Sequence, residues 1–415
     1  MAGDTADIVI IGGGIIGMST AYELSRRDAG RIVVVEKATG VASGSTGASS
    51  AIVRLRYSHT DTMRMARHGQ EVYRDWAAYT GLARPRASMR QTGVLWMLGE
   101  PISTIEHERD RIRGVGGRAR VLSGADLAER FPAISTCATP IDLVDGNDHV
   151  CDDTDAFLFE DDGGYCTDPV GATQDLVEAC RRDGVEVRFR APVAAVRTAA
   201  GRVRGVTLAD GTTIDTPVVV NAAGPWCNRV NEMVGLDHRW ALVPTRIQLM
   251  LRATIEDLPG GVPMIADAAG GIYLRPESGG RQLLVGSIRT DDETEPVVDP
   301  DSYDTRLDED RRAALLHGLH HRLPGLVHRG RITGLAGMYT INRDDVHPVL
   351  GRTHIDGFHV SNGYSGHGFK LAPAVGNLLA QVITGGVGDG DVTVAPEFLS
   401  IDRAPLEVRE KGVLA

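Results

Sequence analysis

The chain has 415 residues, of which 42% are hydrophobic and 24% charged, and its formal net charge is −11. This length and balance predict a folded globular protein with two domains or two interleaved lobes. The acidic balance argues against nucleic acid or an anionic membrane as a partner.

The five cysteines are odd in number and contain no CxxC pair, so we expect neither a disulfide framework nor a zinc or other metal site. A reducing cytoplasm suits this cysteine pattern. The start, MAGDTADIVIIGGG, lacks a basic region, and its apolar run leads directly into glycines, which favours a first strand over a signal peptide. No window approaches the ~20 apolar residues that a membrane span needs. We therefore expect a soluble, cytoplasmic protein.

The first part of the chain has the pattern of a strand, a helix and a second strand. A glycine-, serine- and alanine-rich stretch follows, and then an amphipathic helix and a further strand. The expected elements, in order, are Asp7–Ile11, Ile15–Arg27, Arg31–Glu36, Met63–Tyr79 and Gly93–Leu98.

The same alternation returns at Asp168-Pro169, an N-cap followed by a proline at the first helical position, which predicts a helix to about Arg182. Two strands flank His347-Pro348, and a helix begins at about Ala372. The remaining expected strands are Val185–Phe189, Val193–Thr198, Val203–Leu208, Thr216–Val220, Arg246–Arg252, Gly271–Arg275 and Gln282–Ile288.

The sequence Gly12-Gly13-Gly14-Ile15-Ile16-Gly17 is a GxGxxG pattern between a predicted strand and a predicted helix. Its glycines permit a tight turn, a close approach to a pyrophosphate and close packing of helix on strand. Glu36, followed by Lys37, ends the second strand, where an acid would contact ribose hydroxyls. Together these features predict a dinucleotide-binding site.

The stretch Ser43–Ser50 offers hydroxyls and unhindered amides that could reach the same dinucleotide, although alone it has the composition of a flexible linker. It leads into the apolar Ala51-Ile52-Val53 and then Arg54. Arg54 and Arg56 would point the same way on extended backbone.

Four motifs occur in an order that resembles the D-amino-acid oxidase superfamily, in particular its sarcosine oxidase, glycine oxidase and dimethylglycine dehydrogenase branch. They are GGGIIG with Glu36, GSTGASSAIVR, VVNAAGPW at Val219–Trp226, and GYSGHGFKLAPAVG at Gly363–Gly376. The resemblance implies an α/β (α+β) fold, with a discontinuous Rossmann-like FAD-binding lobe and a mixed, mostly antiparallel substrate lobe.

By this resemblance we expect the chain to pass between the lobes several times. The FAD-binding lobe would comprise residues 1–88, 151–226 and 333–390, the substrate lobe residues 89–150 and 227–332, and a C-terminal tail residues 391–415.

The resemblance also implies the reaction, in which the carbon beside an amine loses a hydride to flavin N5 and an imine results. The expected substrate is a small amino acid or an N-methyl or secondary amine, similar to sarcosine, glycine or proline. Arg54 would bind its carboxylate through a bidentate guanidinium and Lys370 through a single charge. His367 would lie near the flavin. Tyr339 and Tyr273 are pocket candidates. Without these motifs, we would interpret Arg54 and Lys370 as surface groups and the two tyrosines as core residues.

Positions expected to contact FAD by the same resemblance lie in the glycine turn, the glycine-serine stretch, two later strand ends and the SGHGFK block. They are Gly12, Gly14, Ile15, Ile16, Gly17, Glu36, Lys37, Gly44, Ser45, Thr46, Ser49, Ser50, Val193, Ala222, Gly224, Trp226, Gly337, Gly363, Gly366, His367, Gly368 and Lys370.

The chain departs from its relatives at the tethering and oxygen positions. Gly337 precedes Met338-Tyr339-Thr340, where monomeric sarcosine oxidases attach FAD through a cysteine, and no histidine lies between Glu36 and Tyr57. We therefore expect non-covalent FAD. Leu284 stands where those oxidases carry a lysine that promotes reaction with O2, and Arg275 is a substitute cation nearby. The acceptor is O2 or another electron acceptor, and a partner subunit or a homo-oligomer is compatible with this pattern.

Three alternatives stay open at this point. The same scaffold also supports dehydrogenation of a 2-hydroxy acid, and a non-catalytic FAD-binding subunit of an assembly would keep the glycine motif. A nicotinamide dehydrogenase would leave the SGHGFK block unexplained.

Overall fold

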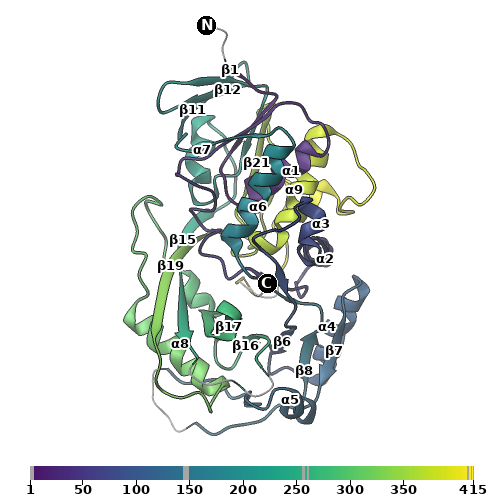
Figure 1. Ribbon diagram of the computed structural model, residues 1–415, viewed down its shortest axis with the longest axis vertical. Coiled ribbons are helices and arrows are strands. Elements are labelled where there is room, and N and C mark those ends of the chain that lie inside the picture. Colours follow the sequence, from purple (N-terminus) through teal and green to yellow (C-terminus); the bar gives the residue numbers. More distant parts are fainter. Residues whose placement is uncertain are drawn as a thin grey trace.

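The computed structural model describes residues 4–143, 149–254, 258, 261–408, 411–412 and 414. Two lobes lie one above the other in Figure 1. The upper lobe is built on a six-stranded sheet in which five neighbouring strands run parallel and the edge strand β20 is antiparallel. The order across this sheet is β10 (Glu186–Arg188), β3 (Ile32–Val35), β2 (Ile8–Ile11), β14 (Val218–Asn221), β21 (Phe358–Asn362) and β20 (Val349–Arg352).

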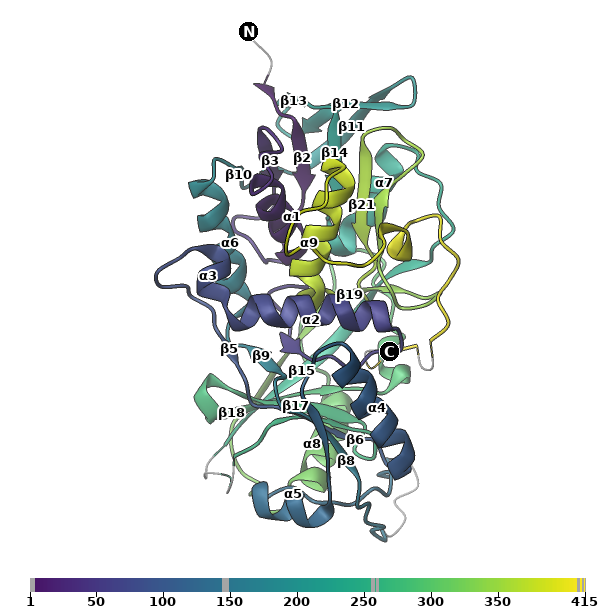
Figure 2. The ribbon, with the colours of Figure 1, turned by 90° about the vertical axis from the view of Figure 1, so that its right-hand side faces the viewer.

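Three helices of the upper lobe pack together on this sheet: α1 (Ile15–Ser25), α6 (Pro169–Arg182) and α9 (Gly368–Thr384). Figure 2 shows α1 and α9 side by side, with α2 (Thr60–Arg74) crossing below them. The helices approach closely at glycines, because a Cβ on Gly376 would lie 2.7 Å from the backbone of Ser19 in α1. A Cβ on Gly69 of α2 would overlap the carbonyl oxygen of Lys370.

The lower lobe is built on an eight-stranded sheet in which β6 and β16 form the single parallel pair. Helix α8 (Glu309–Arg322) packs on its β15, β17 and β18 strands, and α4 (Ile102–Gly114) on β7 and β8. The order is β19 (Ile332–Asn342), β15 (Leu242–Ala253), β18 (Gln282–Ser287), β17 (Ile272–Glu277), β16 (Met264–Asp267), β6 (Val94–Met97), β8 (Phe157–Glu160) and β7 (Ala119–Leu122).

Two smaller sheets complete the fold. A four-stranded sheet has the order β1 (Asp4–Thr5), β13 (Thr213–Asp215), β12 (Arg202–Leu208) and β11 (Val193–Ala199), and a three-stranded one has the order β4 (Ile52–Val53), β9 (Gly164–Cys166) and β5 (Met89–Arg90). The remaining elements are α3 (Trp76–Thr80), α5 (Gly124–Arg130), α7 (Cys227–Met233) and the 3-10 turns at Gly224–Trp226, Ser278–Gly280, Thr290–Glu293 and Pro396–Leu399.

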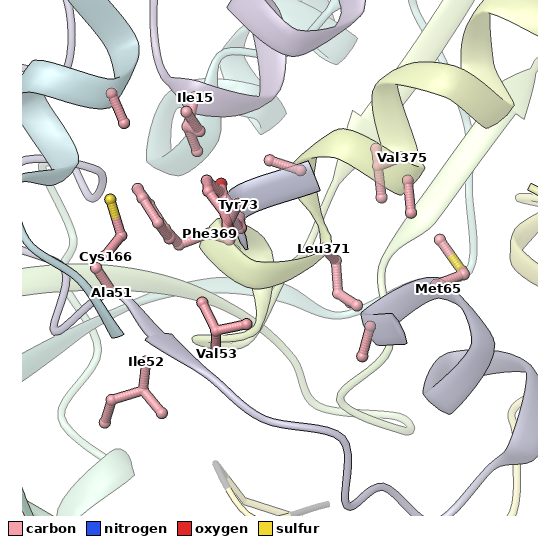
Figure 3. Close-up of a cluster of buried hydrophobic side chains, with 14 of the residues drawn as sticks. Ile15, Ala51, Ile52, Val53, Met65, Tyr73, Cys166, Phe369, Leu371 and Val375 are labelled. Carbon is pink, nitrogen blue, oxygen red and sulfur yellow. The ribbon is translucent and has the colours of Figure 1, made fainter. Parts of the chain in front are cut away.

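The largest core cluster continues from the upper lobe into the segment that leads to Arg54. Figure 3 shows Val53, Tyr73 and Phe369 from three separate elements converging there. The Tyr73 and Phe369 rings stack with their centroids 5.1 Å apart, and the Tyr73 hydroxyl donates to the Phe369 carbonyl at 2.7 Å. Pro373 has no N–H to bond that carbonyl, so the tyrosine replaces a missing helical hydrogen bond.

The predicted fold class is confirmed, and the largest differences are at helix ends. The last helix begins at Gly368 and not near Ala372, because Tyr73 satisfies the carbonyl that Pro373 leaves without its helical partner. The predicted helix Met63–Tyr79 is two helices, broken at Asp75, whose backbone is not helical (φ −116°, ψ 48°). Two strands of the lower sheet, β8 and β19, also extend beyond the predicted lobe boundaries at 150/151 and 332/333.

The expectation of no disulfide is wrong, because Cys137 and Cys151 are bonded to each other, with Cα atoms 5.4 Å apart. Extended backbone pairs Cys137 with Asp153, and the Ala138 N–H donates to the Asp152 carbonyl at 2.8 Å. Two paired segments therefore bring the sulfurs together, which CxxC spacing does not reveal. Among the described residues, no helix combines the length and apolar character that crossing a membrane requires.

Candidate active site

A cavity of about 360 Å³ opens where β2, β3 and β14 end and α1 begins. In open parallel sheets, ligands bind beyond the carboxyl ends of the strands, and the N–H groups at a helix N-terminus favour anionic groups. The fold therefore places a ligand site at the glycine turn.

The glycines of this turn are required by the close approach of three backbone segments. Gly12 has φ +117°, and a Cβ on it would overlap the carbonyl oxygen of Ala222 at the end of β14. A Cβ on Gly17 would overlap the Gly12 carbonyl oxygen, so this glycine permits α1 to pack on the turn. Gly14 is the N-cap of α1, and the following Ile15 N–H donates to the Thr46 hydroxyl at 3.1 Å.

Glu36 and Lys37 lie at the rim of the cavity, after β3. The Glu36 carboxylate accepts from the Gly13 N–H at 2.7 Å and from the Ala38 N–H at 2.8 Å. The Lys37 ammonium lies 3.6 Å from the centre of the Trp226 ring and pairs with Asp301. Asp301 also accepts from the Trp226 indole N–H at 3.0 Å, so a loop of the lower lobe reaches the rim.

Most positions predicted to contact FAD line this cavity, as does Tyr339. They are Gly12, Gly14, Ile15, Ile16, Glu36, Lys37, Gly44, Ser45, Thr46, Ser49, Val193, Ala222, Gly224, Trp226, Gly363, Gly366 and Gly368. The cavity lining does not include five others, Gly17, Ser50, Gly337, His367 and Lys370. Sequence reasoning missed further lining residues, among them Thr340 of the Met338-Tyr339-Thr340 segment, and Arg229 and Asp301, which belong to no motif.

A buried group of basic side chains lies beside the cavity. Arg54 is 2% exposed, His367 3% and Lys370 5%, although their types are usually solvated. The Arg54 guanidinium carbon lies 4.2 Å from the centre of the Tyr57 ring and 5.2 Å from that of Trp96. The Tyr57 hydroxyl is 3.4 Å from His367 Nδ1. The structure thus brings Arg54, Lys370 and His367 together from distant parts of the sequence.

Burial sets the protonation of this group. Burial, with a smaller contribution from Arg54, lowers the pKa of Lys370 well below its ordinary value. Burial and the charges of Lys370 and Arg54 lower the pKa of His367 well below its usual range. Burial raises the pKa of Tyr57 to about 12, so its phenol stays neutral. Two cations in one apolar place stabilise an anion that joins them.

Glu160 is a site residue that sequence reasoning missed. Its carboxylate accepts from the backbone N–H groups of Leu55 at 2.8 Å and Arg56 at 3.0 Å, and from the Trp96 indole at 2.8 Å. It holds the segment that carries Arg54 against β6, and burial raises its pKa. The available signal was an acid at the end of the apolar segment Phe157–Glu160. An acid in this position is also typical of an ordinary strand end.

The two predicted tyrosines differ in position. Tyr339 lines the cavity, and a Cβ on Gly366 would lie 2.6 Å from its ring. Tyr273 is buried behind it, with burial raising the pKa of both phenols. Arg275 lies opposite Leu284 in the sheet, and its Nε donates to the Ser50 carbonyl at 2.6 Å.

The family profile described as "FAD dependent oxidoreductase" (DAO) matches residues 7–382, most of the chain. This protein belongs to the DAO family of FAD-dependent oxidoreductases. Among curated family members, FAD-dependent oxidoreductase domain-containing protein 1 of Xenopus laevis is 25% identical, over 92% of this chain and 80% of its own. Mitochondrial sarcosine dehydrogenase of Mus musculus is 27% identical over 94% of this chain, which spans only 40% of that enzyme.

Solved structures of DAO-like enzymes share this fold. L-proline dehydrogenase from P. horikoshii superposes with a TM-score of 0.79 at 24% identity, covering 96% of this chain and 97% of its own. Glycine oxidase from Geobacillus kaustophilus superposes with a TM-score of 0.78 at 19% identity, covering 97% of this chain and 99% of its own.

The cavity has the features that the family's FAD requires. Only glycine fits at Gly12, the first amides of α1 face a space between strand ends, and an acid stands at its rim. Two buried polar atoms, Oγ1 of the lining residue Thr340 and Nε2 of His367, have no hydrogen-bond partner among the described residues. The residues present therefore fit a dinucleotide with a polar ring system.

Gly14→Ala is predicted to lose FAD while keeping the fold. Its Cβ would lie 3.2 Å from the Thr46 hydroxyl, so the Thr46 side chain would have to move by a few tenths of an ångström, and the methyl would occupy the approach to the first amides of α1. We expect FAD affinity to fall by about tenfold or more, which corresponds to about 1.4 kcal/mol. The measurement is the visible flavin absorbance per chain after purification. Gly40→Ala, with open space around the new methyl, is the matched control and should stay yellow.

Proposed function

We propose that this enzyme oxidises the C–N bond of a small amino acid or secondary amine, similar to sarcosine, glycine or proline, and gives an imine. The observation that carries this proposal is the buried pair of cations, Arg54 and Lys370, beside the cavity. A substrate carboxylate between them would accept hydrogen bonds from both side chains, and hydrogen bonds between charged groups are the strong ones.

In this proposal Arg54 binds the carboxylate as a two-pronged donor and Lys370 as a point charge. The Tyr57 and Trp96 rings fix the Arg54 guanidinium, and Glu160 holds its backbone. Bound FAD would accept a hydride from the carbon beside the amine. Neutral His367 adds no charge near that carbon, and Tyr339 closes the pocket against water.

Several relatives support an amine or amino-acid substrate by their names. The similar proteins include mitochondrial sarcosine dehydrogenase and dimethylglycine dehydrogenase, and the similar structures include an L-proline dehydrogenase and two glycine oxidases. Since this chain spans 40% and 43% of the first two enzymes, their full activities do not transfer with the similarity. The shared element is oxidation at a carbon beside nitrogen.

We further propose that FAD is bound non-covalently, since Gly337 offers no thiol and the stretch from Lys37 to Arg56 no histidine. The acceptor is O2 or another electron acceptor. Leu284 and the Arg275–Glu277 ion pair, 2.7 Å between charged atoms, favour an acceptor other than O2.

The predicted FAD-contacting residues and the lobe boundaries are part of the same proposal. In it the chain passes from the substrate lobe to the FAD-binding lobe after β8 and again after β19, and not at 150/151 and 332/333. A cytoplasmic location, a partner subunit and a homo-oligomer also remain proposals.

The first experiment is anaerobic mixing of the purified protein with sarcosine, glycine, dimethylglycine, proline, D-amino acids and 2-hydroxy acids, while the visible flavin band is followed. We expect one of the amines to bleach the band and to release ammonia, a primary amine or a cyclic imine. Readmitting air then tests O2 as the acceptor. Bleaching by hydroxy acids alone, or by no compound on the panel, would contradict amine oxidation.

Arg54→Ala is predicted to weaken substrate binding and to leave flavin content unchanged, because Arg54 does not line the FAD cavity. Loss of a buried charge pair costs about 2 kcal/mol or more, so KM for the amino acid should rise about thirtyfold or more. The KM of Arg54→Lys should lie between those of the unmodified enzyme and Arg54→Ala, because lysine keeps the positive charge but lacks the two-pronged guanidinium. The control is the matching carboxamide substrate: if its KM changes as much as that of the acid, Arg54 does not bind the carboxylate.

The affinity for a carboxylate is predicted to fall as pH rises through the lowered pKa of Lys370. Below that pKa Lys370 is charged and pairs with the ligand. Above it the amine is neutral, and His367 and Tyr57 are neutral at both ends of this range. The fall should approach about tenfold per pH unit. It is measured as the Kd of a small carboxylic acid without an amine, from flavin difference spectra. Lys370→Arg should remove the dependence, and a Kd independent of pH in the unmodified enzyme would refute the role of Lys370.

A further inference from the structure

Four side chains with metal-binding atoms meet in the lower lobe, at the C-terminal end of α8 (Figure 1). They are Cys137, His149, Cys151 and His321. The Cys137 sulfur and one ring nitrogen of each histidine lie within 4.8 Å of one another, and Cys151 is bonded to Cys137. The Cys137 sulfur is 3.2 Å from His149 Nε2. None of the four lines the FAD cavity.

Two parts of the fold hold these residues in place. Residues 136–139 pair with residues 150–154, and the Thr139 hydroxyl donates to the Val150 carbonyl at 3.0 Å. Arg322, next to His321, donates to the Cys137 carbonyl at 2.9 Å, and its guanidinium pairs with buried Asp267 at 2.6 Å. The backbone of Cys137 is therefore fixed to the end of the helix that carries His321.

The two histidines have an arrangement that a disulfide alone does not explain. Both ring nitrogens of His321 are buried and have no hydrogen-bond partner among the described residues. The His149 and His321 ring centroids are 4.9 Å apart, with the ring planes at 82°. Two imidazoles on one tetrahedral ion have centroids about 5 Å apart. A buried imidazole without a partner is costly, so an ion between the rings would satisfy it.

We propose that, with Cys137 and Cys151 as thiols, these four residues bind Zn²⁺ as a structural Cys2His2 site. Thiolate and imidazole ligands in tetrahedral geometry are the set that zinc prefers. The ligand atoms of Cys137, His149 and His321, which lie within 4.8 Å of one another, must approach to the ~3.3–3.8 Å that adjacent ligands have around a tetrahedral zinc. His149 and Cys151 are exposed, so the ion can enter and these two side chains can move.

The disulfide and the zinc site exclude each other, because they use the same two sulfurs. A phosphine reductant cleaves the disulfide by giving two electrons to the two sulfurs and becoming a phosphine oxide. Water supplies the oxygen of that oxide, and its two protons go to the sulfurs, which become thiols. Zinc binding then releases both thiol protons and leaves two thiolates and two neutral imidazoles on the ion. The bound ion would join Cys137, His149 and Cys151 to α8, and none of these residues lines the FAD cavity.

The test uses the full FAD-loaded chain, reduced with a phosphine, freed of reductant and dialysed against Zn²⁺ or Co²⁺. We expect about one ion per chain by mass spectrometry of the metal, and with Co²⁺ a thiolate charge-transfer band together with the visible bands of tetrahedral cobalt. The oxidised protein should retain no bound ion and should show no thiolate band. Cys151→Ser and His321→Ala should each weaken binding by about tenfold or more.

The matched control is His320→Ala, which removes the neighbouring histidine of α8, whose ring stacks on His328 at 4.0 Å. It should bind cobalt as the unmodified chain does. Flavin content of the reduced variants in the absence of metal shows that they fold, and it is independent of any substrate. A reduced chain without the thiolate band, or a band that survives both Cys151→Ser and His321→Ala, would overturn the zinc site.

Discussion

The position of α9 is the constraint on which the site depends. This helix lies against both α1 and α2, and at each crossing a glycine lets backbone meet backbone: Gly376 against Ser19, and Gly69 against the carbonyl of Lys370. Such contacts leave no room for the helix to slide. The N-terminal end of α9 therefore presents Gly368 to the FAD cavity, while Lys370, two residues later, lies near Arg54.

Arg54 depends on a second set of contacts, and these come from the other lobe. Its segment leaves the apolar core after Val53, and Glu160 and Trp96 of the lower sheet hold the next residues. The result is a cationic pocket whose two charges are contributed from two sides, Lys370 by a helix of the upper lobe and Arg54 by a segment bound to the lower sheet. A carboxylate placed between them would join the two lobes electrostatically.

The sequence allowed prediction of those parts of the site whose chemistry is local. The glycine turn, its acid Glu36 and the N-cap at Asp168 follow from short-range rules, and the structure has them as expected. The early start of α9 was missed because Tyr73, almost 300 residues away, supplies the bond that Pro373 removes. Glu160 was missed for a similar reason, since its partners Leu55 and Trp96 lie far away in the sequence. The Cys137–Cys151 pair is only 14 residues apart, but it depends on pairing of two irregular segments, which no motif indicates.

The order of strands in the upper sheet has a consequence for synthesis of the protein. The N-terminal strand β2 pairs with β14, more than 200 residues later, and β14 in turn pairs with β21 at Phe358–Asn362. A ribosome adds about 5–20 residues per second, so β2, which pairs early with β3 on one side, waits for many seconds before β14 exists on the other. During that time the apolar strand Ile8–Ile11 has an open edge, a surface on which chains associate wrongly.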